Sequence, residues 1–282
     1  MKKLNLLWAV LLLLTACGKD PLPTDVASTM ERQNDGITYI LSIASDGSEL
    51  YFKVLSDNTA EVVGAKEYFD GIELPFNYVG KAVVIPSELT HDSQSYTIVG
   101  IGDNAFYRCW NMTSVEIPTT VEYIGDHAFE TTQIKSIELH DGISRIGASA
   151  FSQCNQLTSI ELGPLVTCVS DHAFYDCHNM TSIIMPNVDT IKSSAFAYVS
   201  KLETIELPAT TKLIERAAFF RCTSLKTVVC RAVTPPVFLD NGWGEDPFDD
   251  SPIQEIKVPA ESVDAYKTAV GWRARANQIV GM

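Results

Sequence analysis

Basic residues are scarce in this chain of 282 residues, and no long apolar run occurs beyond its first residues. Lysine and arginine together number 21 against 35 acidic residues, which gives a formal net charge of −14. Because such a surface repels phosphate groups, nucleic acids and anionic lipid headgroups are excluded as expected partners. With no second apolar run long enough to cross a bilayer, we expect the remainder of the chain to be soluble.

Recognisable catalytic and cofactor motifs are also missing. The sequence has no regular metal-ligand spacing, no nucleophile elbow and no acid–base pair that stands apart from its repeats. These absences predict a protein with no enzymatic activity, no cofactor and no metal ion. The acidic segment 245–250 offers carboxylates to calcium through Glu245, Asp246, Asp249 and Asp250. Because their spacing is irregular, we interpret it as an acidic surface loop.

The first residues form an export signal. Two lysines precede an apolar run from Leu4 to Leu14, which is too short and too early for a membrane-spanning helix of the mature protein. The tetrapeptide that ends in Cys17, LTAC, resembles the bacterial lipobox, in which the cysteine becomes the lipidated first residue. The alternative is an ordinary cleavage site with a chance cysteine. The resemblance implies a signal peptide over 1–16 and a membrane anchor through the lipid alone, followed by a flexible, polar tether over 17–36.

A hexapeptide recurs through the middle of the chain. Its copies begin at residues 101, 124, 146, 169, 191 and 214 and read IGDNAF, IGDHAF, IGASAF, VSDHAF, IKSSAF and IERAAF. A second motif, typified by NMTSVEIP, keeps the same register between them. A period of 22–23 residues is typical of the stacked coils of a solenoid, and the repeats extend over 83–258.

Each repeat predicts one strand and one short helical turn. Apolar and polar side chains alternate in LTSIEL at 157–162, as in a strand with one buried face. In the hexapeptide, the Asp or Ser two residues before Ala-Phe is placed to accept hydrogen bonds at the start of a helical turn. The residue between them, such as His127, is expected to face solvent. His127 and His172 lie two coils apart, at roughly 10 Å, so we expect no metal between them.

Both ends of the solenoid are expected to be sealed. Residues 37–82 contain alternating segments separated by Asp-Gly and Asp-Asn turn signals, which predict an N-terminal cap of β-hairpins. Residues 259–282 predict a C-terminal helical cap in which Val263, Tyr266 and Val270 share one face. The predicted fold is therefore a β-rich α/β solenoid between two caps.

The repeats resemble a known family. Residues 101–121, IGDNAFYRCWNMTSVEIPTTV, resemble the BspA-like leucine-rich repeat of bacterial surface proteins, and residues 258–272, VPAESVDAYKTAVGW, resemble the closing segment of that family. Residues 18–20, GKD, weakly resemble the export signal of surface lipoproteins of the Bacteroidetes. The resemblance implies a binding or adhesion module. We expect it to be a monomer, displayed on the bacterial outer membrane, that binds an extracellular protein or glycan. The alternative is an envelope or glycan-uptake accessory subunit packed permanently against a partner protein.

The exposed strand positions form the candidate binding surface, expected on the concave face of the sheet. They offer carboxylates and hydroxyls to a cationic or hydroxyl-rich ligand, and they are Ser114, Glu116, Ser136, Glu138, Ser159, Glu161, Ser182, Ile184, Thr204 and Glu206. A solvated face without any ligand is the alternative. Glutamates about 4.8 Å apart repel each other by less than about 1 kcal/mol in water, so their alignment does not require a functional explanation.

Four cysteines share one position of the repeat: Cys109, Cys154, Cys177 and Cys222. A free cysteine behaves as a small buried apolar residue, and this is the account we favour. Cys154 and Cys177 lie in adjacent coils, so a disulfide between them in an oxidising envelope is the alternative.

Overall fold

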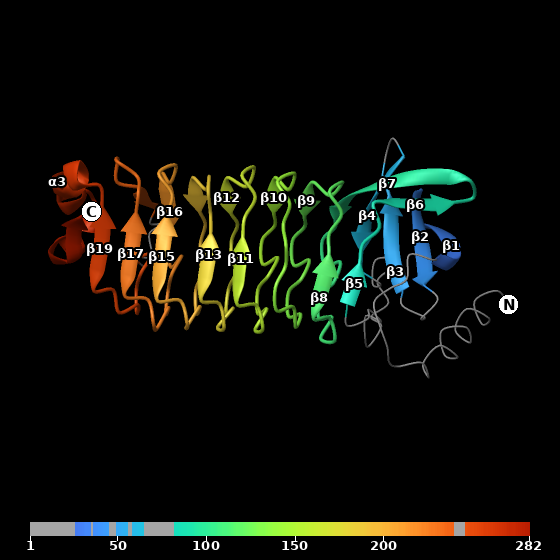
Figure 1. Cartoon of the computed structure of the whole chain (residues 1–282), viewed down its shortest axis with the longest axis horizontal. Helices are drawn as coiled ribbons and strands as arrows, with labels where there is room; N and C mark the ends of the chain where they lie inside the picture. The colour runs from blue at the N-terminus through green and yellow to red at the C-terminus, as the bar shows by residue number, and fades with distance from the viewer. Residues whose placement is uncertain (1–25, 35, 45–48, 56–57, 65–81, 240–245) are drawn as a thin grey trace.

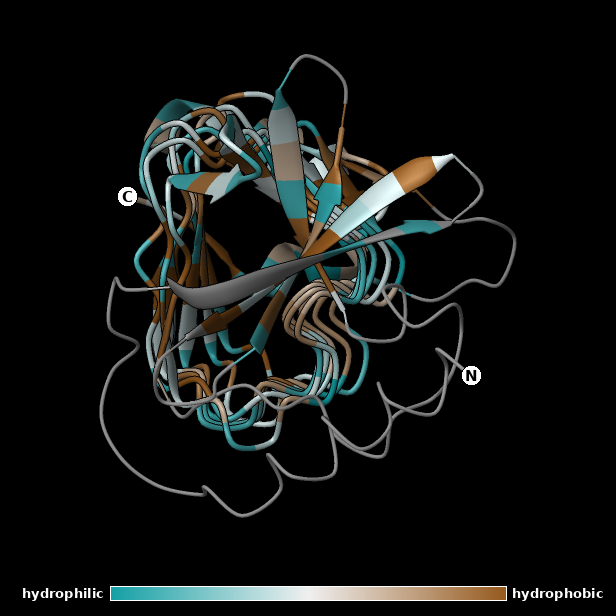
Figure 2. Ribbon diagram, turned by 90° about the vertical axis from the view of Figure 1, so that its right-hand side faces the viewer, coloured by the Kyte–Doolittle hydropathy of each residue, from teal (hydrophilic) through white to brown (hydrophobic). Residues whose placement is uncertain are grey.

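The computed structural model describes residues 26–34, 36–44, 49–55, 58–64, 82–239 and 246–282. Its coils lie side by side in one row, with a β-meander at the N-terminal end and helix α3 at the other (Figure 1). Seen along the row, the coils overlap around a shared interior (Figure 2). The predicted signal peptide, Cys17 and Glu245 lie outside the described residues.

Parallel strands line one side of the row, and we call them the front strands. They are β5 (Ala82–Val84), β8 (Ser114–Glu116), β11 (Ser159–Glu161), β13 (Ser182–Ile184), β15 (Thr204–Leu207), β17 (Thr227–Cys230) and β19 (Glu255–Val258). In β8, β11 and β13 a buried residue stands between two exposed ones, as the alternating pattern predicts. The register sets equivalent residues side by side, with Ser159 opposite Ser182 and Glu161 opposite Ile184.

A second set of parallel strands runs behind the first in Figure 1, and we call them the back strands. They are β7 (Gln94–Ile101), β9 (Tyr123–Ile124), β10 (Arg145–Ile146), β12 (Cys168–Val169), β14 (Thr190–Ile191), β16 (Leu213–Glu215) and β18 (Val237–Leu239). The prediction of one strand per coil is therefore wrong. Most back strands are two or three residues long, which is too short for an alternating pattern to be visible in the sequence. From β9 to β16, each short one buries the residue that opens a hexapeptide, such as Ile124.

The hexapeptides form turns where short helical turns were predicted. The variable position has a positive φ in every copy, at Asn104, His127, Ser149, His172, Ser194 and Ala217, and so does the residue four positions later. The Asn104 N–H donates to the carbonyl of Asp126 in the next coil (2.8 Å), and the Phe106 N–H donates to that of Ala128 (2.7 Å). The Ala105 N–H between them donates within its own turn, to the Gly102 carbonyl (3.3 Å). Because alternate N–H groups point to the next coil, a regular helix cannot form here.

One phenylalanine from each turn contributes to a continuous buried stack. Neighbouring ring centroids lie 5.1–5.4 Å apart with interplanar angles of 2–14°, from Phe106 through Phe129, Phe151, Phe174, Phe196 and Phe219 to Phe248. Each ring is at most 1% exposed, and the alanines that precede the first six are buried with them. The expected buried Ala-Phe row is therefore present.

Phe248 belongs to a seventh turn that the sequence did not reveal. Its ring stacks on Phe219 at 5.1 Å, and the Phe219 N–H donates to the Pro247 carbonyl (2.7 Å) just as in the earlier turns. Asp250 has the positive φ of the turn (56°). The motif was hidden because Phe248 follows Phe219 by 29 residues and because Pro247 stands where the other copies have alanine.

The N-terminal end is an antiparallel meander of four strands: β1 (Val26–Asn34), β2 (Ile37–Ala44), β3 (Glu49–Val54) and β4 (Thr59–Val63). β4 pairs with β7, so the meander continues the back sheet, while β6 (Glu88–His91) forms a hairpin with β7. Ile40, Phe52 and Val62 share the solenoid's core. The flexible tether was predicted to reach residue 36, but β1 occupies 26–34, because the turn at Gly36 (φ 79°) folds it back onto β2.

The C-terminal end combines helix and strand. η2 (Ala260–Ser262), α3 (Val263–Thr268) and η3 (Trp272–Gln278) precede β20 (Ile279–Gly281), which pairs with β19 and extends the front sheet. Tyr266 and Trp272 are fully buried, and each donates a hydrogen bond of 2.7 Å to a backbone carbonyl. Val270 does not share the face of Val263 and Tyr266 as predicted but is 77% exposed, because the helix ends at Thr268 and Gly271 (φ 86°) redirects the chain.

Candidate functional site

The ten residues predicted as a binding surface lie on the front side of the row, and all ten are exposed. We call this surface the front face. Eight of them belong to front strands, whereas Ser136 and Glu138 lie in a coil without an assigned strand between β8 and β11. That coil is held in line because the Lys135 N–H donates to the Thr113 carbonyl (3.2 Å) and the Lys135 carbonyl accepts from Thr158 (3.3 Å). Figure 1 shows the front strands side by side along the row, with their exposed side chains on one continuous side of the molecule.

Charge is distributed unevenly along the front face. Glu116, Glu138 and Glu161 stand in three consecutive coils, and none forms an ion pair within the described part of the chain. Further along, Glu206 pairs with Arg231, and Lys257 pairs with Glu255 at 3.2 Å. Ile184, 54% exposed, separates the two halves. The face therefore has an acidic end with free carboxylates and a C-terminal end whose charges are balanced.

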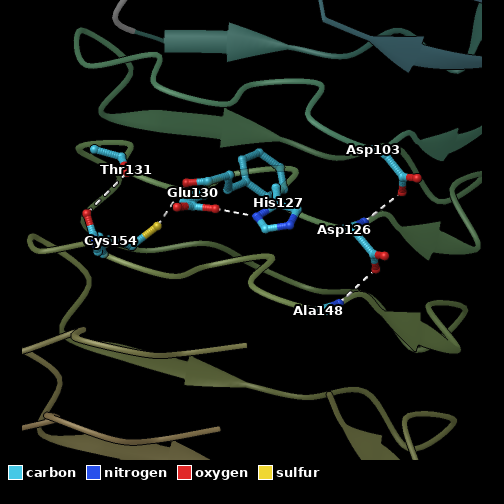
Figure 3. Close-up of polar contacts among 9 residues, drawn as sticks. Asp103, Asp126, His127, Glu130, Thr131, Ala148 and Cys154 are labelled. Atoms are coloured by element: carbon cyan, nitrogen blue, oxygen red, sulfur yellow. Dashed lines mark hydrogen bonds and ion pairs between the residues drawn. The ribbon is translucent and has the colours of Figure 1, made fainter. Parts of the chain in front are cut away.

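The aspartates of the hexapeptide bond between coils, not within a turn as predicted (Figure 3). The Asp126 N–H donates to Asp103 Oδ1 at 2.7 Å, and the Ala148 N–H donates to Asp126 Oδ1 at 2.8 Å. A Cβ on Gly125 would lie 2.5 Å from Asp103 Oδ1, so this bond requires glycine beside it. The side chain of the aspartate therefore joins one coil to the next.

The hexapeptide histidines have structural surroundings. His127 contacts Glu130 of its own turn through Nδ1 (Figure 3), and the His172 ring lies 5.4 Å from Tyr175. Neither belongs, among the described residues, to a group of three side chains that could hold a metal ion. Their shared position is defined by its positive φ rather than by exposure, since Ala217 occupies it and is buried.

The cysteines on the repeat position also bond between coils. Cys154 and Cys177 are free thiols, and each donates through Sγ to the carbonyl of the phenylalanine one coil earlier, at 3.1 and 2.9 Å. Cys222 does the same at 3.1 Å. Burial raises the pKa of the Cys154 thiol to about 12, which keeps it protonated at neutral pH. These thiols are therefore poor nucleophiles.

The acidic segment that we interpreted as a surface loop is used to hold the seventh turn. Asp246 accepts the N–H of Phe248 at Oδ1 (2.8 Å) and pairs with Arg275 at Oδ2 (3.2 Å). Asp250 pairs with Arg221 at 3.1 Å. These carboxylates already have partners within the turn and its neighbours.

Exposed apolar side chains at the C-terminal end were missed in the sequence. Val237 is 60% and Leu239 41% exposed on β18, which pairs only with β16 within the described strands, and Val270 lies beyond the end of α3. β18 is three residues long, and Val270 was expected on the buried face of a helix, so no signal in the sequence pointed to this surface.

Stacked coils with parallel strands and a short turn in each repeat define a leucine-rich repeat solenoid. Residues 99–231 match the family model described as the BspA type leucine rich repeat region, in six copies. Within these residues the repeats are therefore of the BspA leucine-rich repeat type. Proteins of this class are generally non-enzymatic modules of protein interaction or adhesion, typically exposed on bacterial surfaces. No curated protein matches the chain.

Solved structures share the fold. A leucine-rich repeat protein from Bacteroides ovatus is 24% identical with a TM-score of 0.51, and the match covers 75% of this chain and 58% of that one. A leucine rich cell surface protein from Faecalibacterium prausnitzii is 23% identical with a TM-score of 0.52, covering 86% and 73%. The chain thus spans less than two thirds of the Bacteroides ovatus protein. Within the ranges described above, no helix is long and apolar enough to cross a membrane.

Proposed function

We propose that this protein is a non-enzymatic binding module of the bacterial cell surface, held on the outer membrane by a lipid on Cys17. Its front face binds a basic segment of an extracellular protein. The observation that carries the proposal is the row of Glu116, Glu138 and Glu161, which are exposed in consecutive coils and unpaired within the described residues. The predicted signal sequence supports the location at the cell surface. The match of the repeats to the BspA type supports a role as a binding module.

Physical reasons favour a cationic partner at the acidic end. Neighbouring coils are about 4.8 Å apart, which is below the Debye length of about 8 Å at physiological salt, so the three carboxylates act on a ligand together. The buried phenylalanine stack fixes the coils, so little ordering cost is expected when the ligand binds. The paired charges beyond Ile184 would contribute less, because each already has a partner.

The proposal is tested by reversing charge on the front face. We would measure binding of the mature chain to arrays of extracellular-matrix proteins and of glycans, at physiological salt, with Glu138→Lys and Glu161→Lys. The matched control is Glu122→Lys, because Glu122 is equally an exposed glutamate but precedes the back strand β9. We expect both front-face variants to lose binding about tenfold or more and the control to keep it. Equal binding by all four proteins would refute the front-face site.

Display at the surface has its own test. Protease added to intact cells should cut the chain, and Cys17→Ala should release it from the membrane fraction. A chain left uncut until the outer membrane is opened would contradict surface exposure. A chain that stays on the membrane without Cys17 would contradict the lipid anchor.

Val237 and Leu239, two exposed apolar side chains on the same face of β18, favour a second candidate function. In it the protein is an accessory subunit of the envelope that packs permanently against a partner protein, since apolar side chains gathered on a surface are typical of interfaces. Native electrophoresis of a mild detergent extract distinguishes the two. A large complex that Leu239→Glu dissociates would support the accessory subunit, and a monomer in the wild type would count against it.

A further inference from the structure

Three metal-ligating side chains from distant segments meet at the N-terminal end of the molecule. Glu31 lies on β1, His91 ends β6, and Asp92 begins the turn between β6 and β7, whose positions are shown in Figure 1. His91 Nε2 is 3.2 Å from Glu31 Oε2 and 3.6 Å from Asp92 Oδ2. All three ligand atoms lie within 4.8 Å of one another.

A simple ion pair does not account for this arrangement. The two carboxylates approach the same ring nitrogen, and one imidazole N–H can donate a good hydrogen bond to only one of them. Their oxygens repel each other at this distance, and the His91 side chain between them is only 9% exposed, which weakens screening by water. A divalent cation among the three atoms would neutralise both carboxylates and use the nitrogen lone pair.

The spacing of the three atoms suits a small cation. Ligands bound at about 2.0–2.1 Å in a tetrahedron lie about 3.3–3.4 Å from each other. The two distances from Nε2, 3.2 and 3.6 Å, lie on either side of that value. The Asp92 side chain is 88% exposed, so an ion can enter from solvent and keep a water as its fourth ligand.

The turn geometry sets Asp92 beside the histidine. β6 and β7 form a tight hairpin in which His91 faces Gln94, and both turn residues have positive φ, 48° at Asp92 and 65° at Ser93. Such turns usually carry glycine, whereas here an aspartate holds the left-handed position directly after His91. The sequence could not show the site, because Glu31 is 60 residues away from His91.

We propose that Glu31, His91 and Asp92 form a binding site for a divalent transition-metal ion, with zinc the best fit. An imidazole beside two carboxylates suits zinc better than calcium or magnesium, which prefer oxygen ligands alone. The ion would tie β1 to the β6–β7 hairpin. Because it binds the folded arrangement only, it would stabilise the N-terminal meander.

Calorimetric titration of the whole mature chain with zinc chloride tests the site. The chain is prepared without a polyhistidine tag and freed of metal with a chelator. We expect one zinc ion per chain. Replacing His91 with glutamine, Asp92 with asparagine or Glu31 with glutamine should each weaken binding by more than about tenfold, since even outer-shell changes cost 10–100-fold. Four-coordinate visible absorption with cobalt should accompany binding in the wild type alone.

The matched control is His127→Gln, which removes a histidine paired with a single carboxylate. It should leave zinc affinity unchanged. Since Glu31 and Asp92 are exposed, their variants test the site even if His91→Gln fails to fold. Zinc should also raise the unfolding temperature of the wild type and of His127→Gln but not that of Asp92→Asn. An unchanged affinity in any of the three ligand variants that folds, or no zinc bound by the wild type, would overturn the proposal.

Discussion

Replacing Phe174 by leucine should lower the free energy of unfolding more than the same replacement of Phe106. Phe174 has a ring on each side in the buried stack, Phe151 at 5.4 Å and Phe196 at 5.4 Å, with interplanar angles of 2° and 4°. Phe106 stands at the N-terminal end of the stack and has one such neighbour, Phe129 at 5.3 Å. Both rings are buried to the same extent, so the number of stacked neighbours is the main difference.

The magnitude follows from the number of ring pairs lost. A stacked aromatic pair contributes about 0.5–1.5 kcal/mol beyond the apolar area it buries. Phe174→Leu removes two pairs, or roughly 1–3 kcal/mol, whereas Phe106→Leu removes one, or roughly 0.5–1.5 kcal/mol. Both replacements remove the same side-chain volume, so that contribution does not distinguish them. Phe174→Ala should cost about 3–5 kcal/mol in total, because it also leaves a cavity.

Urea unfolding followed by circular dichroism measures this difference. The urea midpoints of wild type, Phe106→Leu and Phe174→Leu are compared. If the dependence of the unfolding free energy on urea is the same in all three, the shift in midpoint reports the change in stability. Phe220→Leu serves as the control, because that ring is half-buried outside the stack. Equal losses at Phe106 and Phe174 would show that the rings act only as apolar volume, and the stacking argument would fail.

Three more predictions concern the turns. Gly125→Ala should cost about 1–3 kcal/mol, because its Cβ would lie 2.5 Å from Asp103 Oδ1, and an unchanged midpoint of urea unfolding would contradict this close approach. His172→Val should destabilise by about 1 kcal/mol or more, since a β-branched residue tolerates φ 54° poorly, and an unchanged midpoint would contradict the turn geometry. The thiol pKa values of Cys154 and Cys222, raised by burial from 9.0 to about 12, make the folded state retain protons that the unfolded state releases. Stability should therefore fall as pH rises from 9 towards 12, and less so when both are alanine.

Much of the fold was predictable because the repeats impose a fixed register. Six hexapeptides at steps of 22–23 residues predicted the buried Ala-Phe row, and the alternation at 157–162 predicted which front-strand residues face water. The back strands were missed, because two residues such as Tyr123 and Ile124 carry no period. The seventh turn was missed because the insertion before Phe248 hid its spacing.

The turns show why residue types alone mislead. Asp126 in front of Ala-Phe is typical of a helix N-cap, and a helix was predicted. In the structure its carboxylate accepts an N–H from Ala148 in the following coil. Each turn has two positive φ values four residues apart, and alternate backbone N–H groups of the turn also donate to the following coil. A helix does not form here, because N–H groups that a helix would bond internally donate instead to carbonyl groups of the next coil.

The candidate site was predictable in part for the same reason. Since coils stack in register, residues such as Glu138 and Glu161 had to share one face wherever the strands lay. Which of them form ion pairs was not predictable: Glu206 pairs with Arg231, which directly follows β17 beside the end of β15. Glu31 and His91 also come together only in the folded chain, in which β1 pairs with β2.

By itself the sequence determined the acidic charge and the coil-by-coil stacking, because each depends on composition or on a repeating distance along the chain. Tertiary structure alone decided which carboxylates remain unpaired, where apolar side chains stay exposed and which distant ligands converge. Those properties depend on distances between segments that no local pattern records.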